Sequence, residues 1–378
     1  MKIVCASDSF KGSLTSMRTA ELFEKAARDA GGDFEVTEVP VADGGEGTAY
    51  AVTKAAGGEM VSTEVHGPLM DTVRASYGML PGGRAVIEMA AASGLVLVPP
   101  EKRDPLITTS YGTGELIKDA LDRGARDLTI AIGGSATNDG GTGCLTALGY
   151  VFRDAGGHKL AGSGISLGSI ASIDAEEADP RLRESRITVM CDVINPLTGP
   201  DGATYVYGPQ KGADEETLEI LERGMVRYRD VLRDMTGIDC DRVAGSGAAG
   251  GMGAALHAVL GAELRRGIEA VLDLIGFDEM IKDADLVITG EGRADSQSLE
   301  GKVMQGVALR AQKAGVPVTA IVGCLGEGWE GLLSCGISRI IPIAPEGMSA
   351  EESMRRAEDL YIEAAAKYLL TLKQTVVQ

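Results

Sequence analysis

The sequence predicts an α/β protein of two domains, with a doubly wound parallel sheet built from both chain ends and a second α/β domain inserted into it. Three observations support this prediction. At 378 residues the chain is longer than one ordinary hydrophobic core. Short apolar strands alternate with helical segments at both ends, which is typical of a parallel sheet. Between the ends this alternation is interrupted, which indicates a separate domain.

The sheet formed from the chain ends is of the Rossmann or flavodoxin-like type. Its strands are apolar, and each leads into a loop rich in glycine and charged residues. Ligands of such sheets bind at the carboxyl ends of the strands, so these loops are candidate ligand loops. The predicted strands are residues 2–7, 34–39, 284–289, 316–322 and 337–343. The predicted helices are residues 16–30, 49–56, 302–314 and 348–373.

The inserted domain begins where the pattern changes. Shorter strands over 59–65, 72–79 and 85–88 are separated by Gly-Pro and Pro-Gly-Gly turns, and we place a domain boundary near Gly67. Further strands are predicted over 128–132 and 187–191, with an edge hairpin over 150–159. Helices are predicted over 215–235, 267–274 and 278–282; another ends at 124, and another opens from the glycine-rich stretch 244–253 and runs through 260. The predicted domains are residues 1–66 with 284–378, and residues 67–283, with the active site in the cleft between them.

A glycine-rich turn follows the strand 128–132, with the sequence GGSATNDGGTG, and a helical pattern follows the turn. A strand, a glycine-rich turn and a helix start together form the geometry that binds phosphate. This turn matches neither GxxxxGK[ST] nor a clean GxGxxG, and a purely structural turn is the alternative. A second glycine-rich turn, around Gly247, can bind an anion or allow close helix packing. The candidate cofactor-binding residues are Gly133, Gly134, Ser135, Thr137, Asn138, Gly140, Gly247, Gly250 and Gly251.

Composition limits the class of protein. The net charge of −19 and the aromatic content of 4% argue against nucleic-acid binding, and they require any anionic substrate to be held by local lysines and arginines. Six cysteines without CxxC spacing indicate reduced thiols in a cytoplasm. Asp8 comes too early for a signal-peptide core, and the apolar stretch 85–99 is too short to span a bilayer. We therefore expect a cytoplasmic protein without a membrane partner.

The loops at the strand ends combine carboxylates, cations and glycine turns. Phosphoryl transfer needs this combination, because cations and amide groups neutralise phosphates, carboxylates bind Mg²⁺, and a positioned carboxylate accepts the proton of the acceptor hydroxyl. No Ser-His-Asp arrangement is evident, and we interpret the three histidines as structural. The charged residues collected in this way are Asp8, Lys11, Asp43, Glu46, Asp139, Asp192, Glu291, Arg293 and Asp295.

Nine segments of the chain, in order, resemble the type I glycerate kinase family over almost the whole length. They are ASDSFKGS, PVADGGEGT, EMAAASGL, TTSYGTGELI, IGGSATNDGGTG, CDVINPLTGPDGA, YGPQKGA, GAAGGMGAAL and TGEGRADSQSLEGK. The resemblance implies a two-domain α/β enzyme that uses ATP and Mg²⁺ to phosphorylate D-glycerate, usually to 2-phosphoglycerate and ADP, in glyoxylate or sugar-acid breakdown. Two departures are small: Ser7 and Ala294 replace a proline and a larger aliphatic residue common in the family.

Roles follow as hypotheses. Lys11 and Arg293 hold phosphate or the glycerate carboxylate, because a compact ammonium suits a moving phosphoryl group and a guanidinium fork suits a carboxylate. Asp192 and Asp295 divide Mg²⁺ binding and proton acceptance between them, and the sequence does not assign which does which. The candidate substrate-binding residues are Asp8, Ser9, Asp43 and Glu46.

Three alternatives stay open at this stage. The first is phosphorylation at the 3-hydroxyl of glycerate. The second is a sugar-acid sensor without catalysis, although the chain has no basic tail for DNA. The third is an NAD-dependent dehydrogenase, although DSFKGS after the first strand is not GxGxxG. Glycerate is the expected small-molecule partner, and a homo-oligomer is possible.

Overall fold

The computed structural model describes residues 1–31, 33–42, 44–45, 47–299 and 302–376. The chain forms two compact units. Unit 1 comprises Met1–Asp43, Lys54–Ala56 and Ile268–Gln378, and unit 2 comprises Gly44–Thr53 and Gly57–Gly267. The predicted domain boundaries differ from these bounds at residues 44–53, 57–66 and 268–283, and they stay a proposal.

Unit 1 contains a five-stranded sheet in the order β15-β13-β11-β1-β2. All neighbouring strands are parallel. The predicted parallel sheet from both chain ends is therefore confirmed. Its strands are β1 (Lys2–Cys5), β2 (Glu35–Glu38), β11 (Leu286–Thr289), β13 (Val318–Val322) and β15 (Ile337–Pro342).

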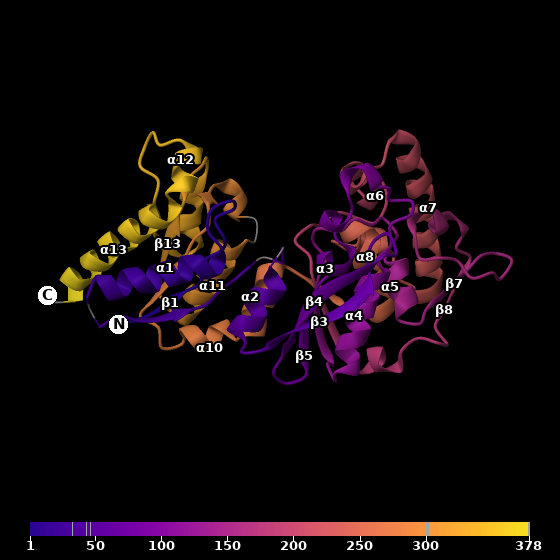
Figure 1. Ribbon diagram of the computed structural model, residues 1–378, viewed down its shortest axis with the longest axis horizontal. Helices are drawn as coiled ribbons and strands as arrows, with labels where there is room; N and C mark the ends of the chain where they lie inside the picture. Colours follow the sequence, from indigo (N-terminus) through magenta and orange to yellow (C-terminus); the bar gives the residue numbers. More distant parts are fainter. Residues whose placement is uncertain (32, 43, 46, 300–301, 377–378) are drawn as a thin grey trace. The chain divides into compact units, whose positions relative to one another are not determined.

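Helices cover the sheet of unit 1. Helix α1 (Ser16–Asp29) and helix α13 (Ala357–Val376) run side by side, and their apolar residues form one core with Ile3 and Ile288 (Figure 1). Helix α11 (Val303–Ala314) connects β11 to β13. The predicted closing helix is two helices, α12 (Ala350–Arg355) and α13, with no glycine or proline at the break. Unit 1 also contains the helices α9 (Gly267–Ile275) and α10 (Phe277–Ile281) and the short strands β12 (Arg293–Ala294) and β14 (Cys324–Leu325). The first residue of α9, Gly267, belongs to unit 2.

Unit 2 contains a six-stranded mixed sheet in the order β10-β9-β6-β5-β4-β3. Strands β3, β4 and β5 pair antiparallel, whereas β5, β6, β9 and β10 pair parallel. The inserted α/β domain is thereby confirmed as a second sheet. Its strands are β3 (Glu59–His66), β4 (Thr72–Leu80), β5 (Arg84–Glu88), β6 (Asp127–Ala131), β9 (Arg186–Met190) and β10 (Glu263–Arg265).

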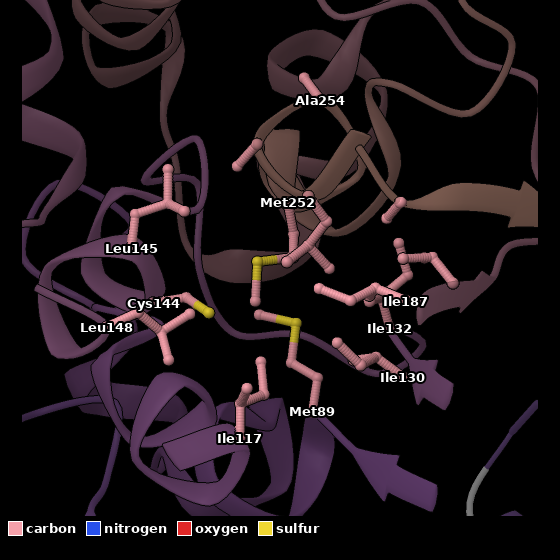
Figure 2. Close-up of a cluster of buried hydrophobic side chains, with 14 of the residues drawn as sticks. Met89, Ile117, Ile130, Ile132, Cys144, Leu145, Leu148, Ile187, Met252 and Ala254 are labelled. Atoms are coloured by element: carbon pink, nitrogen blue, oxygen red, sulfur yellow. The ribbon is translucent and has the colours of Figure 1, made fainter. Parts of the chain in front are cut away.

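The core of unit 2 lies between this sheet and its helices. Figure 2 shows Met89 and Met252 pointing toward each other, with Cys144 beside them and Ile130 from the sheet. The flexible methionine side chains fill the space where helices from distant parts of the sequence meet. The helices of unit 2 are α2 (Thr48–Ala55), whose last two residues belong to unit 1, α3 (Ala90–Ser93), α4 (Tyr111–Asp122), α5 (Thr142–Ala147), α6 (Ala203–Tyr207), α7 (Glu215–Thr236) and α8 (Ala248–Leu260).

The predicted edge hairpin over 150–159 is present as a tight antiparallel turn, in which the amide of Asp154 donates to the carbonyl oxygen of His158 at 3.0 Å, but its return segment is not a full strand. Strand β7 (Val151–Arg153) pairs antiparallel with β8 (Ser172–Asp174), and only a single bridge joins Arg153 to Lys159. The Asp154 carboxylate accepts hydrogen bonds from the amides of two residues within the intervening turn, so this segment closes on itself instead of forming a second strand. Across the described ranges, we find no helix with the length and apolar character needed to cross a membrane.

Candidate active site

The carboxyl ends of β1 and β11 open into a cavity of about 470 Å³ in unit 1. The parallel register pairs Cys5 with Ile288, so the loops that follow the two strands are neighbours. The amide of Asp8 donates a hydrogen bond of 2.8 Å to the carbonyl oxygen of Gly290. Asp8 and Glu291 both line the cavity, each in the loop after its strand.

Lys11 reaches this cavity from a turn that Phe10 anchors. The Phe10 ring is buried and packs edge-on against Tyr361, with ring centroids 5.8 Å apart. Gly292 allows the neighbouring loop to come close, because a β-carbon there would lie 3.3 Å from the α-carbon of Phe10. The Lys11 side chain is exposed and lines the cavity, and it forms no ion pair within the described ranges. It is therefore a cation available to a ligand.

Arg293 and Asp295 lie on the same cavity wall. The Arg293 Nε atom is 3.3 Å from the Asp295 Oδ2 atom, and the Arg293 side chain is 66% exposed. An ion pair this exposed contributes little stability, so the guanidinium is able to turn to an anionic ligand. The other carboxylate oxygen of Asp295 accepts a hydrogen bond of 3.0 Å from the amide of Gln297.

Glu291 is the buried carboxyl of the cavity, with 8% of its surface exposed. Burial raises the pKa of Glu291 to about 7. A hydrogen bond from Ser298 and the charge of Lys302 oppose this rise in pKa, whereas the charges of Asp8 and Asp295 add to it. The Oε1 atom of Glu291 is buried and has no hydrogen-bond partner in the part of the chain that the structure describes.

The glycine-rich turn of unit 2 is organised around Asp139, which is fully buried. Its carboxylate accepts hydrogen bonds from the amide and hydroxyl of Ser110, at 2.8 and 2.7 Å, and from the amides of Gly141 and Gly143. Burial raises the pKa of Asp139, and these hydrogen bonds oppose the rise. The carboxylate thus satisfies amides at the start of α5 and fixes the turn.

A buried lysine supports the same turn. Lys211 is 2% exposed, and its Nζ atom donates a hydrogen bond of 2.6 Å to the carbonyl oxygen of Thr137. Burial lowers the pKa of Lys211 to about 7, and the nearby Asp139 opposes this shift. The amide of Asn138 donates to the hydroxyl of Thr204 at 3.2 Å. The turn is thus hydrogen-bonded to two polar side chains, Thr204 of α6 and Lys211 of the short 3-10 helix that follows α6.

The candidate cofactor residues fall into two groups by exposure. Gly133 and Gly134 are exposed, and with Glu88, Ala90 and Leu97 they line a cavity of about 300 Å³ in unit 2. The other seven are buried. They are Ser135, Thr137, Asn138, Gly140, Gly247, Gly250 and Gly251. Their nucleotide contact stays a prediction.

Gly250 illustrates the second group. It has a φ of +67°, and a β-carbon there would collide with the carbonyl oxygen of Thr137. Its neighbour Ala249 also has a positive φ, of 53°. The second glycine-rich turn therefore permits the start of α8 to approach the first turn closely. Close packing and anion binding had been the two alternatives for this turn, and the contacts account for the packing.

The structure thus brings part of the predicted set together. Asp8, Ser9, Lys11, Arg293 and Asp295 line one cavity of unit 1. Asp192 belongs to unit 2, where it follows β9 and its Oδ1 atom accepts a hydrogen bond of 2.8 Å from the amide of Gly267. Asp43 and Glu46 lie outside the described residues.

The donor set fits Mg²⁺ bound together with a nucleotide. Within the described ranges, no three His, Cys, Asp or Glu side chains are grouped so that they could hold a metal ion. A closed protein cage is not what Mg²⁺ needs, because this ion keeps several waters and takes one or two carboxylates plus substrate phosphates. Asp295, beside the Lys11 and Arg293 cations, is a suitable carboxylate of this kind.

The sequence alone predicts no specific role for three charged residues near the unit 1 cavity and the glycine-rich turn. Glu291 was placed in a loop at a strand end, Lys211 in a long loop, and Lys302 at a helix start. A carboxylate directly after an apolar strand was a usable signal for Glu291. For Lys211 there was none, because burial of a loop lysine depends on packing between segments far apart in the chain.

Comparison with known proteins identifies close relatives. Residues 3–373 match the sequence profile described as the Glycerate kinase family. The chain is 48% identical over 373 residues to "Glycerate 2-kinase" of Escherichia coli (strain K12), covering 98% of both chains. It is 46% identical over 368 residues to "Glycerate kinase" of Bacillus subtilis (strain 168), covering 97% of this chain and 96% of the relative.

A solved structure agrees with the fold as well as the sequence. The crystal structure of the protein assigned as glycerate kinase 2 from Salmonella typhimurium LT2 superposes with a TM-score of 0.91. The two chains are 46% identical, and the match covers 100% of each. The two-unit architecture described above is therefore shared by an experimentally determined relative.

Proposed function

The chain belongs to the glycerate kinase family and is a glycerate kinase, and from this premise we propose that it phosphorylates D-glycerate at the 2-hydroxyl. The products are 2-phosphoglycerate and ADP. One observation carries the choice of hydroxyl: the relative named glycerate 2-kinase is 48% identical to this chain over 98% of both proteins. Phosphorylation of the 3-hydroxyl is the alternative that the experiment below distinguishes.

The unit 1 cavity is our candidate for the anionic groups. Lys11 and Arg293 neutralise the glycerate carboxylate and the transferred phosphoryl group, and Asp8 and Ser9 contact the substrate hydroxyls. The support for this assignment is that both cations are exposed and line one cavity with those two residues. Local cations of this kind hold an anion against the net charge of −19.

The glycine-rich turn of unit 2 is our candidate for part of the nucleotide. Gly133 and Gly134 offer exposed backbone beside a cavity whose lining side chains are mostly apolar, which suits a purine and its attached phosphates. The buried residues of the turn keep it in shape.

Mg²⁺ completes this proposal. When bound, Mg²⁺ neutralises charge on the phosphate oxygens. Asp295 and Asp192 are the candidate protein ligands. The support for Asp295 is its position on the wall of the cavity that also carries Lys11 and Arg293.

The position of the phosphate in the product tests the proposal. The purified protein is incubated with D-glycerate, ATP and MgCl₂, and the product is observed by ³¹P NMR without proton decoupling. A phosphate on C2 couples to one proton and appears as a doublet, whereas a phosphate on C3 couples to two and appears as a triplet. We expect the doublet. A triplet would assign the enzyme to the 3-hydroxyl. The proposed reaction would be refuted if neither enantiomer of glycerate gave a phosphoglycerate signal.

A further inference from the structure

Glu291 combines three properties that suit a group in contact with the substrate. It lines the unit 1 cavity, it is 8% exposed, and its Oε1 atom has no hydrogen-bond partner in the described part of the chain. A buried acceptor without a partner lowers the stability of the fold, because nothing compensates its lost hydration. A ligand that donates an O–H group to this carboxylate would remove that cost. Glycerate carries two such hydroxyls, whereas ionised phosphates have none to donate.

The other candidate carboxylates are engaged. Asp295 accepts from the Gln297 amide with one oxygen and pairs with Arg293 through the other. Asp192 accepts from the Gly267 amide. The terminal torsion of a glutamate is soft, so a rotation of the Glu291 carboxyl can present its unpartnered oxygen to the cavity. Glu291 is therefore the better placed group to receive a proton.

We propose that Glu291 accepts the proton of the glycerate hydroxyl that becomes phosphorylated. This inference rests on the glycerate kinase reaction and on glycerate binding in the unit 1 cavity. In the step, the substrate O–H bond breaks and its proton moves to a carboxylate oxygen of Glu291. The hydroxyl oxygen forms a bond to the γ-phosphorus of ATP. The bond from that phosphorus to its bridging oxygen breaks, and the electron pair leaves with ADP.

The surroundings of Glu291 suit this role. Burial, Asp8 and Asp295 raise its pKa, Ser298 and Lys302 lower it, and the result is about 7. A base is most effective when its pKa lies near the working pH. Because the ionised form is the active one, kcat/KM should rise with pH and level off above about 7.

The isosteric variant Glu291→Gln tests the role. It keeps the shape of the side chain and cannot accept the proton. We expect kcat to fall about 100-fold or more, the range seen when a general base is lost. The KM for ATP and the Mg²⁺ concentration for half-maximal rate should stay within about two-fold, and the acidic limb of the pH profile should disappear. As a contrast, Asp295→Asn should raise the Mg²⁺ requirement.

Glu330→Gln is the matched control, because Glu330 is exposed and lies outside the cavity. A raised Mg²⁺ requirement in Glu291→Gln would make Glu291 a metal ligand and overturn the inference. Unchanged kcat with a raised KM for glycerate would overturn it also. Should Glu291→Gln not fold, wild-type kcat/KM that stays flat between pH 6 and 8 would count against it. If the wild-type enzyme does not phosphorylate glycerate at all, the proposed function fails first.

Discussion

At the scale of single residues, burial separates charged side chains that look alike in the sequence. Lys11 and Lys211 are each followed by a glycine with a positive φ, 81° at Gly12 and 101° at Gly212. Lys11 is exposed beside a cavity, whereas Lys211 is buried and binds a backbone carbonyl. A lysine that is free to meet a ligand and one that holds a loop therefore call for different tests.

Replacing Lys11 with methionine should reduce catalysis without unfolding the protein. The Lys11 side chain is exposed and lacks an ion pair in the described ranges, so its loss removes no native contact of consequence. If it neutralises the transferred phosphoryl group, kcat should fall by about 100-fold or more. Steady-state kinetics and the melting temperature are measured together.

Lys25→Met is the control, since Lys25 is exposed on α1 and does not line the cavity. It should have wild-type kinetics. Near-normal turnover in Lys11→Met would remove Lys11 from the mechanism.

Lys211 should make stability depend on pH. Its folded-state pKa of about 7 lies below the ordinary value of 10.5, so between these values the unfolded chain binds a proton that the folded chain does not. Stability conferred on the wild type relative to Lys211→Met should therefore rise as pH increases from 7 to 10. The ceiling is about 1.4 kcal/mol per pH unit for one proton.

Calorimetric melting of both proteins at pH 7, 8, 9 and 10 measures this difference. Lys102→Met, at an exposed lysine of unit 2, should leave the difference from wild type flat. A wild-type advantage that stays flat from pH 7 to 10 would show that Lys211 keeps its proton in the folded state and would contradict the lowered pKa.

At the scale of elements, the sequence predicted best where local pattern and tertiary environment agree. The strands of the unit 1 sheet begin and end within about two residues of their predicted bounds. The strands β1, β11 and β13 are apolar runs that are almost wholly buried between polar loops, whereas the edge strands β2 and β15 are partly exposed. The hairpin over 150–159 turns where the sequence predicts, but the strand that pairs along β7 is β8, about twenty residues further along the chain. Strand β10, with three residues at a sheet edge, has too short a pattern to predict.

Gly250 in α8 and Gly261 directly after this helix separate the cost of backbone strain from the cost of close packing. Gly250 and Gly261 both have a positive φ, of 67° and 69°, but only at Gly250 would a β-carbon meet other atoms. Gly261→Ala should cost about 1–2 kcal/mol for the left-handed backbone alone. Gly250→Ala should cost about 1–3 kcal/mol more, because the added methyl group pushes against the Thr137 carbonyl.

Urea unfolding followed by circular dichroism measures both costs, with the wild type as the reference. Equal destabilisation in the two variants would mean that the close approach of α8 to the glycine-rich turn carries no energetic weight.

At the scale of the whole molecule, the sequence identified the loops of the site better than the exposure of their residues. Parallel sheets place their loops at one edge, and this rule brought Asp8, Lys11, Arg293 and Asp295 to one cavity. The rule does not say which residues of a glycine-rich turn face solvent. That depends on Asp139, which is buried within the turn, and on Lys211, which binds the turn from a segment about seventy residues further along the chain.

The net charge also belongs to this scale, and it bears on how the ligands stabilise the protein. A charge of −19 opposes every anion, but its field is screened beyond about 8 Å at physiological salt, whereas the cations of the unit 1 cavity act on a ligand in direct contact.

ATP with Mg²⁺ and glycerate should each raise the melting temperature in 150 mM NaCl, since a ligand at 100 times its Kd contributes about 2.7 kcal/mol. NAD should give no shift, and EDTA should diminish the shift from ATP. The Lys11→Met variant should lose part of the glycerate shift while Lys25→Met keeps it. Stabilisation by NAD and none by ATP would contradict the assignment of the nucleotide.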